Sequence, residues 1–223
     1  MVKSVAWEWK SVKKDDEEFW KTPAKEAYYL LDRWKKQGKK NILDLGSGIG
    51  RHSIFFAKDG FDVCAFDLSE DAIDKSRKWA QEERLKIDFK VGDMLELPYE
   101  DNCFDCIYCR NSISHSDTVG VKKTIGEVHR VLKDKGECYM TLGSKNTWGW
   151  KEDWEQVDEN TKIRKDNGAE NGIPHFYADL NLIYDLLSDF EIIDIQQIED
   201  FHKIGSKHTS SFHYHILVKA NKS

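Results

Sequence analysis

Three glycines at alternate positions, Gly46, Gly48 and Gly50, form a G-x-G-x-G turn directly after the apolar segment 41–45. Glycines at this spacing allow the backbone to turn sharply and a ligand to lie against the main chain. A dinucleotide-binding fingerprint would place a small residue at position 51, where this chain has Arg51, and a P-loop would continue with Gly-Lys-Ser/Thr. The turn therefore predicts a cofactor site of a different kind.

Two acids follow near the ends of the next two apolar segments. Asp67 ends the segment 61–67, at the distance where a carboxylate can accept hydrogen bonds from both hydroxyls of a ribose. Asp93 follows the segment 87–91 on the same rim and could accept a hydrogen bond from an exocyclic amine such as that of adenine. The alternative for Asp67 is a helix cap, but Ser69 is better placed for that role. The turn and the acids together predict a nucleoside ligand.

The elements that must position these residues alternate between strand and helix. This alternation predicts an α/β fold with helices on both faces of a largely parallel sheet, whose ligand binds beyond the carboxyl ends of the strands. Two final strands without a helix between them are expected to form an antiparallel hairpin at one edge. The expected strands are 41–45, 61–67, 87–91, 104–109, 137–142, 190–198 and 211–220, and the expected helices are 51–59, 69–81, a segment through Val121, Ile125, Val128 and Leu132 that closes at Gly136, and 179–188.

Two further segments flank this alternation. A helix begins at Thr22-Pro23 and ends before Gly38, and it is expected to pack near the mouth of the site. The rhythm breaks between residues 143 and 178, a stretch rich in charge and in tryptophan. We therefore expect one domain over residues 1–223, with an N-terminal helical cap at 1–40 and an inserted, lid-like segment at 143–178.

Five motifs in order along residues 41–142 resemble those of class I S-adenosylmethionine-dependent methyltransferases of the small-molecule type. They are Asp44-Leu-Gly-Ser-Gly-Ile-Gly-Arg-His52, Asp67, Gly92-Asp-Met-Leu-Glu-Leu-Pro-Tyr99, Phe104-Asp-Cys-Ile-Tyr108 and Glu127-Val-His-Arg-Val-Leu-Lys-Asp-Lys-Gly136. The resemblance implies a Rossmann-like three-layer sandwich around a seven-stranded sheet of order 3-2-1-4-5-7-6, mostly parallel, with the last strand antiparallel.

The same resemblance implies the cofactor S-adenosylmethionine and roles for individual residues. Gly46, Gly48 and Gly50 would lie along its methionine part and Asp67 would hold its ribose. Asp93 and Met94 would flank the adenine, and Arg110 and Asn111 would close the pocket. Asp44, Ser47 and Leu68 complete the cofactor-binding set that the resemblance implies.

The methyl acceptor is expected to meet parts of the chain outside these motifs. Candidates are Trp7, Trp9 and Trp20, the loop 111–116 and an apolar lid made by Trp148, Trp150, Trp154, Phe176 and Tyr177. Pro174 stiffens the chain before His175, so our hypothesis is that His175 or His115 acts as a base or contacts the substrate. The alternative is that each histidine only anchors its loop through hydrogen bonds.

Composition limits the partners. The 223 residues are 39% hydrophobic and carry a net charge of -6, which argues against a nonspecific nucleic-acid binder. No apolar run approaches the roughly 18 residues of a membrane span, and the N-terminus lacks a signal-peptide pattern, so we expect a cytoplasmic protein with no membrane partner. The four residues Cys109-Arg110-Asn111-Ser112 stand where family members that methylate nucleobase or glutamine amines have Asn/Asp-Pro-Pro-Tyr/Phe, which favours a small-molecule acceptor. The whole-chain pattern is also similar to members that methylate thiols or chalcogens. The oligomeric state is left open.

Two patterns suggest metal sites at first sight. Cys103, Cys106 and Cys109 form C-x-x-C-x-x-C, but on a strand they would lie on opposite faces, and they are expected to fill the core. His213 and His215 share a strand face without an evident third ligand. We therefore expect no metal. The functional alternatives are an RNA- or protein-modifying methyltransferase, a noncatalytic S-adenosylmethionine-binding module and, as the weakest, a nicotinamide-dependent enzyme.

Overall fold

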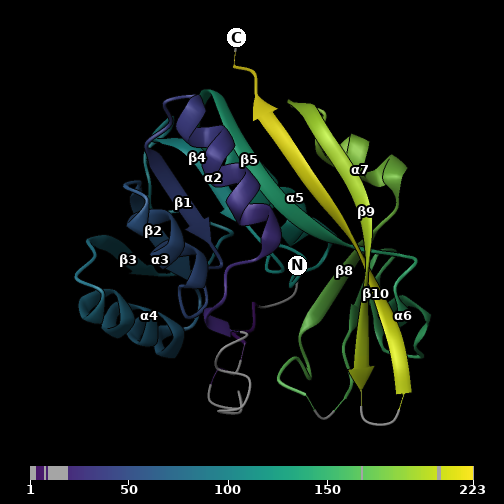
Figure 1. The fold of residues 1–223 in the computed structure, drawn as a ribbon. Coiled ribbons are helices and arrows are strands. Elements are labelled where there is room, and N and C mark those ends of the chain that lie inside the picture. Colours follow the sequence, from purple (N-terminus) through teal and green to yellow (C-terminus); the bar gives the residue numbers. More distant parts are fainter. Residues whose placement is uncertain (1–3, 8, 10–19, 167, 205–206, 223) are drawn as a thin grey trace.

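The computed structural model describes residues 4–7, 9, 20–166, 168–204 and 207–222. A central sheet of seven strands runs in the order β3-β2-β1-β4-β5-β10-β9 (Figure 1). The first five strands pair in parallel, and β10 is antiparallel to both of its neighbours. The order and directions confirm the expected Rossmann-like sheet. The strands are β1 Asn41–Leu45, β2 Asp62–Asp67, β3 Ile87–Val91, β4 Phe104–Cys109, β5 Leu132–Ser144, β9 Phe190–Ile204 and β10 Lys207–Ala220.

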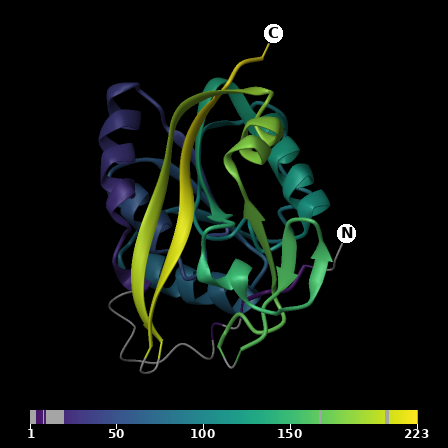
Figure 2. The ribbon, with the colours of Figure 1, turned by 90° about the vertical axis from the view of Figure 1, so that its right-hand side faces the viewer.

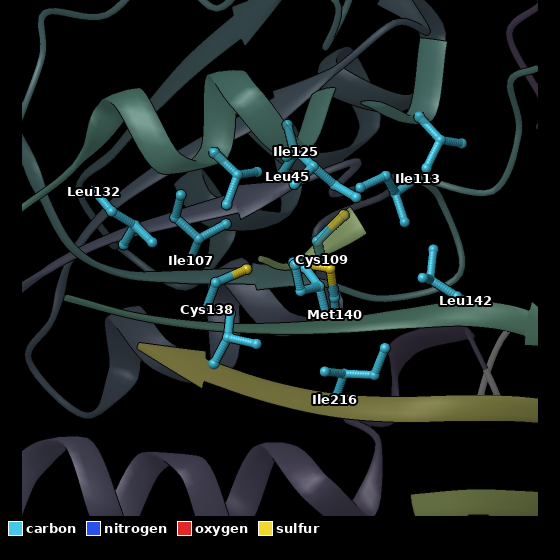
Figure 3. Packing of buried hydrophobic residues seen from close by; sticks show 14 of the residues in the cluster. Leu45, Ile107, Cys109, Ile113, Ile125, Leu132, Cys138, Met140, Leu142 and Ile216 are labelled. Carbon is cyan, nitrogen blue, oxygen red and sulfur yellow. The ribbon is translucent and has the colours of Figure 1, made fainter. Parts of the chain in front are cut away.

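Helices cover both faces of this sheet, which gives three layers. One face carries α2 (Lys25–Lys36) and α3 (Arg51–Lys58), whose Trp34 and Phe56 are buried against it. The other face carries α5 (Thr118–Val131) and α7 (Leu180–Leu186), and their apolar residues form the larger core with the inner strands. Figure 3 shows part of this core, with Ile125 of α5 and residues of the inner strands. The helix α4 (Glu70–Glu82) packs on β2 and β3 beside α3.

The inserted segment contains structure that its sequence pattern did not predict. A short helix α6 (Trp148–Lys151) is followed by β6 (Gln156–Asp158), β7 (Thr161–Ile163) and β8 (Pro174–Ala178), which pair in antiparallel order. Strand β8 joins the end of β5 in parallel, so the insertion continues the main sheet below its carboxyl edge (Figure 2). These strands are three to five residues long, too short for an alternating pattern to stand out.

Side-chain caps begin two of the helices that were expected from the sequence. The Ser69 hydroxyl accepts a hydrogen bond from the Ala72 amide and begins α4, and the Asp179 carboxylate does the same for Leu182 and begins α7. Both caps were expected. The expectation that Gly136 closes α5 is wrong, because α5 ends at Val131 and β5 begins at the next residue.

A buried carboxylate fixes α2 to the sheet. Glu137 on β5 is 3% exposed and accepts two hydrogen bonds from the Arg33 guanidinium, at 2.8 and 2.9 Å. It also accepts hydrogen bonds from the Trp34 indole and the Gln37 amide. Four donors thus satisfy a charge that would otherwise be costly to bury.

Over the described part of the chain, the helices are too short or too polar to span a membrane.

Candidate functional site

The glycine turn is fixed to the neighbouring strand. The amides of Gly46 and Ser47 donate to the carbonyl oxygen of Phe66, and the Gly48 amide donates to an Asp67 carboxylate oxygen at 2.8 Å. Gly46 and Gly48 have φ angles of +72° and +54°, a region that non-glycine residues rarely adopt. A methyl group on Gly46 would overlap Ser112, and one on Gly48 would overlap the Trp9 ring. Two of the glycines are thus required by close approach as well as by the turn.

A cavity of about 200 Å³ lies over this turn, at the carboxyl ends of the parallel strands. Of the residues that the resemblance assigned to the cofactor, Gly46, Ser47, Gly48, Asp67, Leu68, Asp93, Met94, Arg110 and Asn111 line it. Further lining comes from residues 4–7, Trp9, Trp20, Ile49, Arg51, His52, Leu95, Ser112, His115, Ser116 and Glu170. The structure therefore brings most of the predicted set to one hollow.

Asp44 and Gly50 are the two members of that set that do not line the cavity. Asp44 is buried beneath the turn and accepts a hydrogen bond from the Ser53 hydroxyl at 2.5 Å. Burial raises the pKa of Asp44 to about 7. A methyl group on Gly50 would overlap the Ser76 side chain, so this glycine serves the contact between the turn and α4. Both residues support the turn from behind.

The two rim acids differ in their surroundings. The Asp67 carboxylate accepts hydrogen bonds from the backbone amides of Gly48 and Ser69, each at 2.8 Å. Burial raises the pKa of Asp67 despite these hydrogen bonds. Asp93 accepts a hydrogen bond from the Leu95 amide at 3.0 Å. A carboxylate has about four acceptor positions, so both acids can take further donors from a ligand.

Two polar atoms in the cavity wall are buried without a hydrogen-bond partner. They are the hydroxyl of Ser47 and the indole nitrogen of Trp7. Buried polar groups in folded proteins are almost always paired, and an unpaired one costs about 1–3 kcal/mol. A polar ligand in this cavity would supply the missing partners, so the residues present fit a bound nucleoside cofactor.

Tryptophans from the N-terminal segment close one side of the cavity. The rings of Trp7, Trp9 and Trp20 lie with centroids 4.3–5.2 Å apart. All three were expected near the acceptor. The expected lid aromatics lie elsewhere, since none of the five lines this cavity. Trp148 packs on Trp154, Trp150 packs on Tyr177, and Phe176 is part of the main core. Part of the predicted cap, residues 1–3, 8 and 10–19, lies outside the described residues.

The loop after β4 is held rigidly. Asn111 has a φ of +53°, and its amide donates to the Thr141 hydroxyl at 2.8 Å. The Ser112 hydroxyl donates to the Leu45 carbonyl oxygen, which joins this loop to the glycine turn. The Arg110 guanidinium forms an ion pair with Glu26 of α2 at 2.5 Å. The cofactor turn, the loop and the N-terminal helix are thus mutually braced.

The two histidines proposed as catalytic lie together. Their ring centroids are 4.9 Å apart, and only His115 lines the cavity. Glu170 from the insertion contacts both: its carboxylate lies 3.7 Å from Nε2 of His115 and 3.4 Å from Nε2 of His175. Burial is the main cause that lowers the pKa of His115, to about 4. Burial alone would raise the pKa of Glu170, but the interaction with His175 and the charges around it hold that pKa well below its usual range.

Glu170 is a site residue that sequence reasoning missed. It stands in a charged stretch of the insertion, 55 residues after His115, and no motif spacing marks it.

The cysteines behave as predicted: Cys106 belongs to the core on one face of the sheet, and Cys109 belongs to the core on the other.

A family model described as a methyltransferase domain matches residues 42–136. This range contains the glycine turn, both rim acids and the loop after β4. The sarcosine/dimethylglycine N-methyltransferase of Aphanothece halophytica is 35% identical over 103 residues, which are 45% of this chain and 36% of that protein. The sterol 24-C-methyltransferase of Kluyveromyces lactis is 26% identical over 192 residues, or 82% of this chain and 49% of that protein.

Among solved structures, a SAM-dependent methyltransferase from Methanosarcina mazei superposes with a TM-score of 0.72 at 22% identity, over 83% of this chain and 94% of that one. The likeness concerns the fold. The chain spans less than half the length of the curated relatives it matches.

Proposed function

Because this chain contains a class I S-adenosylmethionine-dependent methyltransferase domain, we propose that it transfers the methyl group of S-adenosylmethionine to a small-molecule acceptor. The observation that carries the proposal is the cavity over the glycine turn, which gathers both rim acids and two unpartnered polar atoms. A cavity of this kind suits a ligand with a ribose, an amine and a polar tail.

Each part of the cofactor would have its own contact surface. Asp67 would accept the ribose hydroxyls, while Asp93 and Met94 would border the adenine. Gly46 and Gly48 line the cavity, so the methionine part would lie along their backbone, next to the Ser112 and Trp9 side chains that pack on these two glycines. The Ser47 hydroxyl could bind its polar end. When bound, the cofactor supplies an electrophilic methyl group on a sulfonium.

Methyl transfer from a sulfonium requires the acceptor atom in line with the methyl carbon and water kept away. Positioning of this kind can lower a barrier by about 7–11 kcal/mol. The braced loop of Arg110 to Ser112 gives the cavity a fixed polar wall, and the cluster of Trp7, Trp9 and Trp20 gives it an aromatic one. These walls would orient both reactants.

A small acceptor suits the size and cover of the cavity. A volume of about 200 Å³ beneath a tryptophan cluster leaves little space for a folded macromolecule to approach. The names of two relatives refer to sterol and to sarcosine or dimethylglycine, both small molecules. The hypothesis that His115 or His175 is a general base stays a prediction.

The test has two stages. Calorimetric titration with S-adenosylmethionine should show one binding site per chain, and NAD in the same titration should bind more weakly. Methyl-labelled cofactor is then supplied with the protein to a cell extract that is afterwards separated by size. Label in the low-mass fraction would support a small acceptor. Label in RNA or protein would contradict it, and cofactor binding without any transfer would indicate a noncatalytic binding module.

A further inference from the structure

We propose that His115, Glu170 and His175 form a binding site for one divalent transition-metal ion in the wall of the cavity, with an open coordination position that faces the methyl acceptor. The three side chains come from the loop before α5, the insertion and strand β8. Their ligand atoms all lie within 4.8 Å of one another. Two imidazoles and one carboxylate are the donor set of many catalytic zinc and iron sites.

The distances fit an ion better than they fit direct hydrogen bonds. Nε2 of His175 lies 3.4 Å from one Glu170 oxygen, and Nε2 of His115 lies 3.7 Å from the other. A charge-assisted hydrogen bond from nitrogen to a carboxylate is usually about 2.7–2.9 Å long. Two atoms that each lie about 2.0–2.1 Å from one tetrahedral ion are roughly 3.3–3.4 Å apart. The spacing at His175 therefore matches two ligands of one ion.

The second nitrogen of His175 supports the same assignment. Its Nδ1 lies 3.0 Å from the carbonyl oxygen of Ile173, so Nδ1–H donates there. That bond leaves Nε2 directed at the Glu170 carboxylate. Metal-binding histidines commonly donate their other ring N–H to a backbone carbonyl, which fixes the tautomer and the ring orientation. A cation between Nε2 and the carboxylate would satisfy both.

The carboxylate is itself held in place. Arg164 contacts Oε2 of Glu170, the same oxygen that lies 3.4 Å from Nε2 of His175, and it pairs with Asp166 at 2.6 Å. Arg164 thereby orients Glu170, while Asp166 offsets the guanidinium charge near a cation. His213 is a further titratable group close enough to act on His115. Of the charged groups around the three ligands, the cation Arg164 is thus already paired with a carboxylate.

Three protein ligands leave at least one coordination position for another molecule. Since His115 and Glu170 line the cavity whereas His175 stands behind them, that position is reached from the cavity. A thiolate or alkoxide acceptor would suit it, because a bound cation stabilises the deprotonated form. The acceptor would release its proton to solvent on binding and then form a bond to the methyl carbon as the carbon–sulfur bond of the sulfonium breaks. This role rests on the proposed function, and a ligating histidine is then unavailable as a base.

The first experiment measures metal binding without methyl transfer. The full chain is freed of metal with a chelator and titrated with Zn²⁺, and with Co²⁺ as a visible-absorption probe. We expect one tight site per chain, weakened at least 100-fold by Glu170→Gln and by His175→Ala. His129→Ala is the matched control, since His129 packs against Phe190 and does not line the cavity. Circular dichroism and S-adenosylmethionine affinity, measured in parallel, show whether each variant is folded.

The outcomes separate this proposal from the proposed function. Zinc that fails to bind the unmodified chain, or that binds Glu170→Gln and His175→Ala as tightly as the unmodified chain, overturns the site. In that case the three side chains form a histidine–carboxylate cluster without a metal. The open position is tested by adding azide to the Co²⁺ form: a saturable spectral change supports it, and an unchanged spectrum contradicts it. Cofactor binding is measured separately, so its loss would count against the methyltransferase and not against the metal.

Discussion

The Asp67 carboxylate accepts a hydrogen bond from the Gly48 amide at 2.8 Å, so the acid at the end of β2 holds the glycine turn at the end of β1. The turn is therefore shaped before any cofactor binds. A preshaped site loses less conformational entropy on binding than a mobile one. One carboxylate would thus both order the turn and receive the ribose.

Replacement of Asp67 should weaken cofactor binding more than it weakens the fold. In Asp67→Asn the charged acceptor that we propose for the ribose hydroxyls is lost, and hydrogen bonds to charged groups contribute about 1.5–3 kcal/mol. We expect an affinity for S-adenosylmethionine about 10- to 100-fold lower by calorimetry. Asp62→Asn, at the exposed start of the same strand, is the matched control. Equal affinities for the two variants would contradict the role of Asp67.

Gly50 should contribute to stability because the Ser76 side chain lies directly next to it. Its φ of +89° resembles the +87° of Gly60, but a methyl group on Gly50 would overlap Ser76, whereas nothing lies near Gly60. Gly50→Ala and Gly60→Ala would both carry the backbone cost of about 1 kcal/mol for a left-handed residue. We expect Gly50→Ala to lower the free energy of unfolding by a further 1–3 kcal/mol or so through overpacking, as measured by denaturant titration.

A double variant tests the cause of that difference. Gly50→Ala combined with Ser76→Gly removes the overlapping hydroxymethyl group, so it should recover part of the loss beyond what the two single variants predict by addition. Strict additivity would show that the overlap is not the source of the effect.

Asp44 should make the protein less stable as the pH rises. Its folded-state pKa of about 7 exceeds the ordinary value of 3.8, so the folded state keeps a proton that the unfolded chain has already released. The free energy of unfolding therefore falls by roughly 4 kcal/mol at most between about pH 4 and pH 7. Above pH 7 it stays at the lower value. Asp44→Asn keeps an acceptor for Ser53 without the charge. We expect it to melt higher than the unmodified protein at pH 8 and about equally at pH 4; a constant difference across this range would contradict the assignment.

The sheet and its cofactor turn followed from the sequence because their signals are local. Buried strands of five or six residues, the caps at Ser69 and Asp179, and the spaced glycines each report on their own segment. Glu170 meets His115 only after β8 has joined β5, so their proximity is a product of tertiary structure. For the tryptophans of the insertion, the sequence predicted a contact with the site that the structure does not have. Their aromatic content suggested a lid, but Trp148 and Trp154 pack against each other, away from the cavity. Trp150 also lies away from it, under Lys145 and Lys162.

The contact between Glu137 and α2 predicts a strong dependence of stability on one carboxylate. In Glu137→Gln, the partly buried Arg33 loses its ion pair, and the amide presents a donor to the Trp34 indole N–H or to the guanidinium. Breaking a buried ion pair by removing one partner typically costs about 3–5 kcal/mol, and the partial exposure of Arg33 places the expected loss nearer 2–3 kcal/mol. Glu191→Gln, which removes an exposed pair with Lys219, should cost much less, because solvent screens that pair. Denaturant titration of both variants measures the difference. Similar losses would mean that apolar packing of Trp34 and Leu30, rather than the buried carboxylate, holds α2 on the sheet.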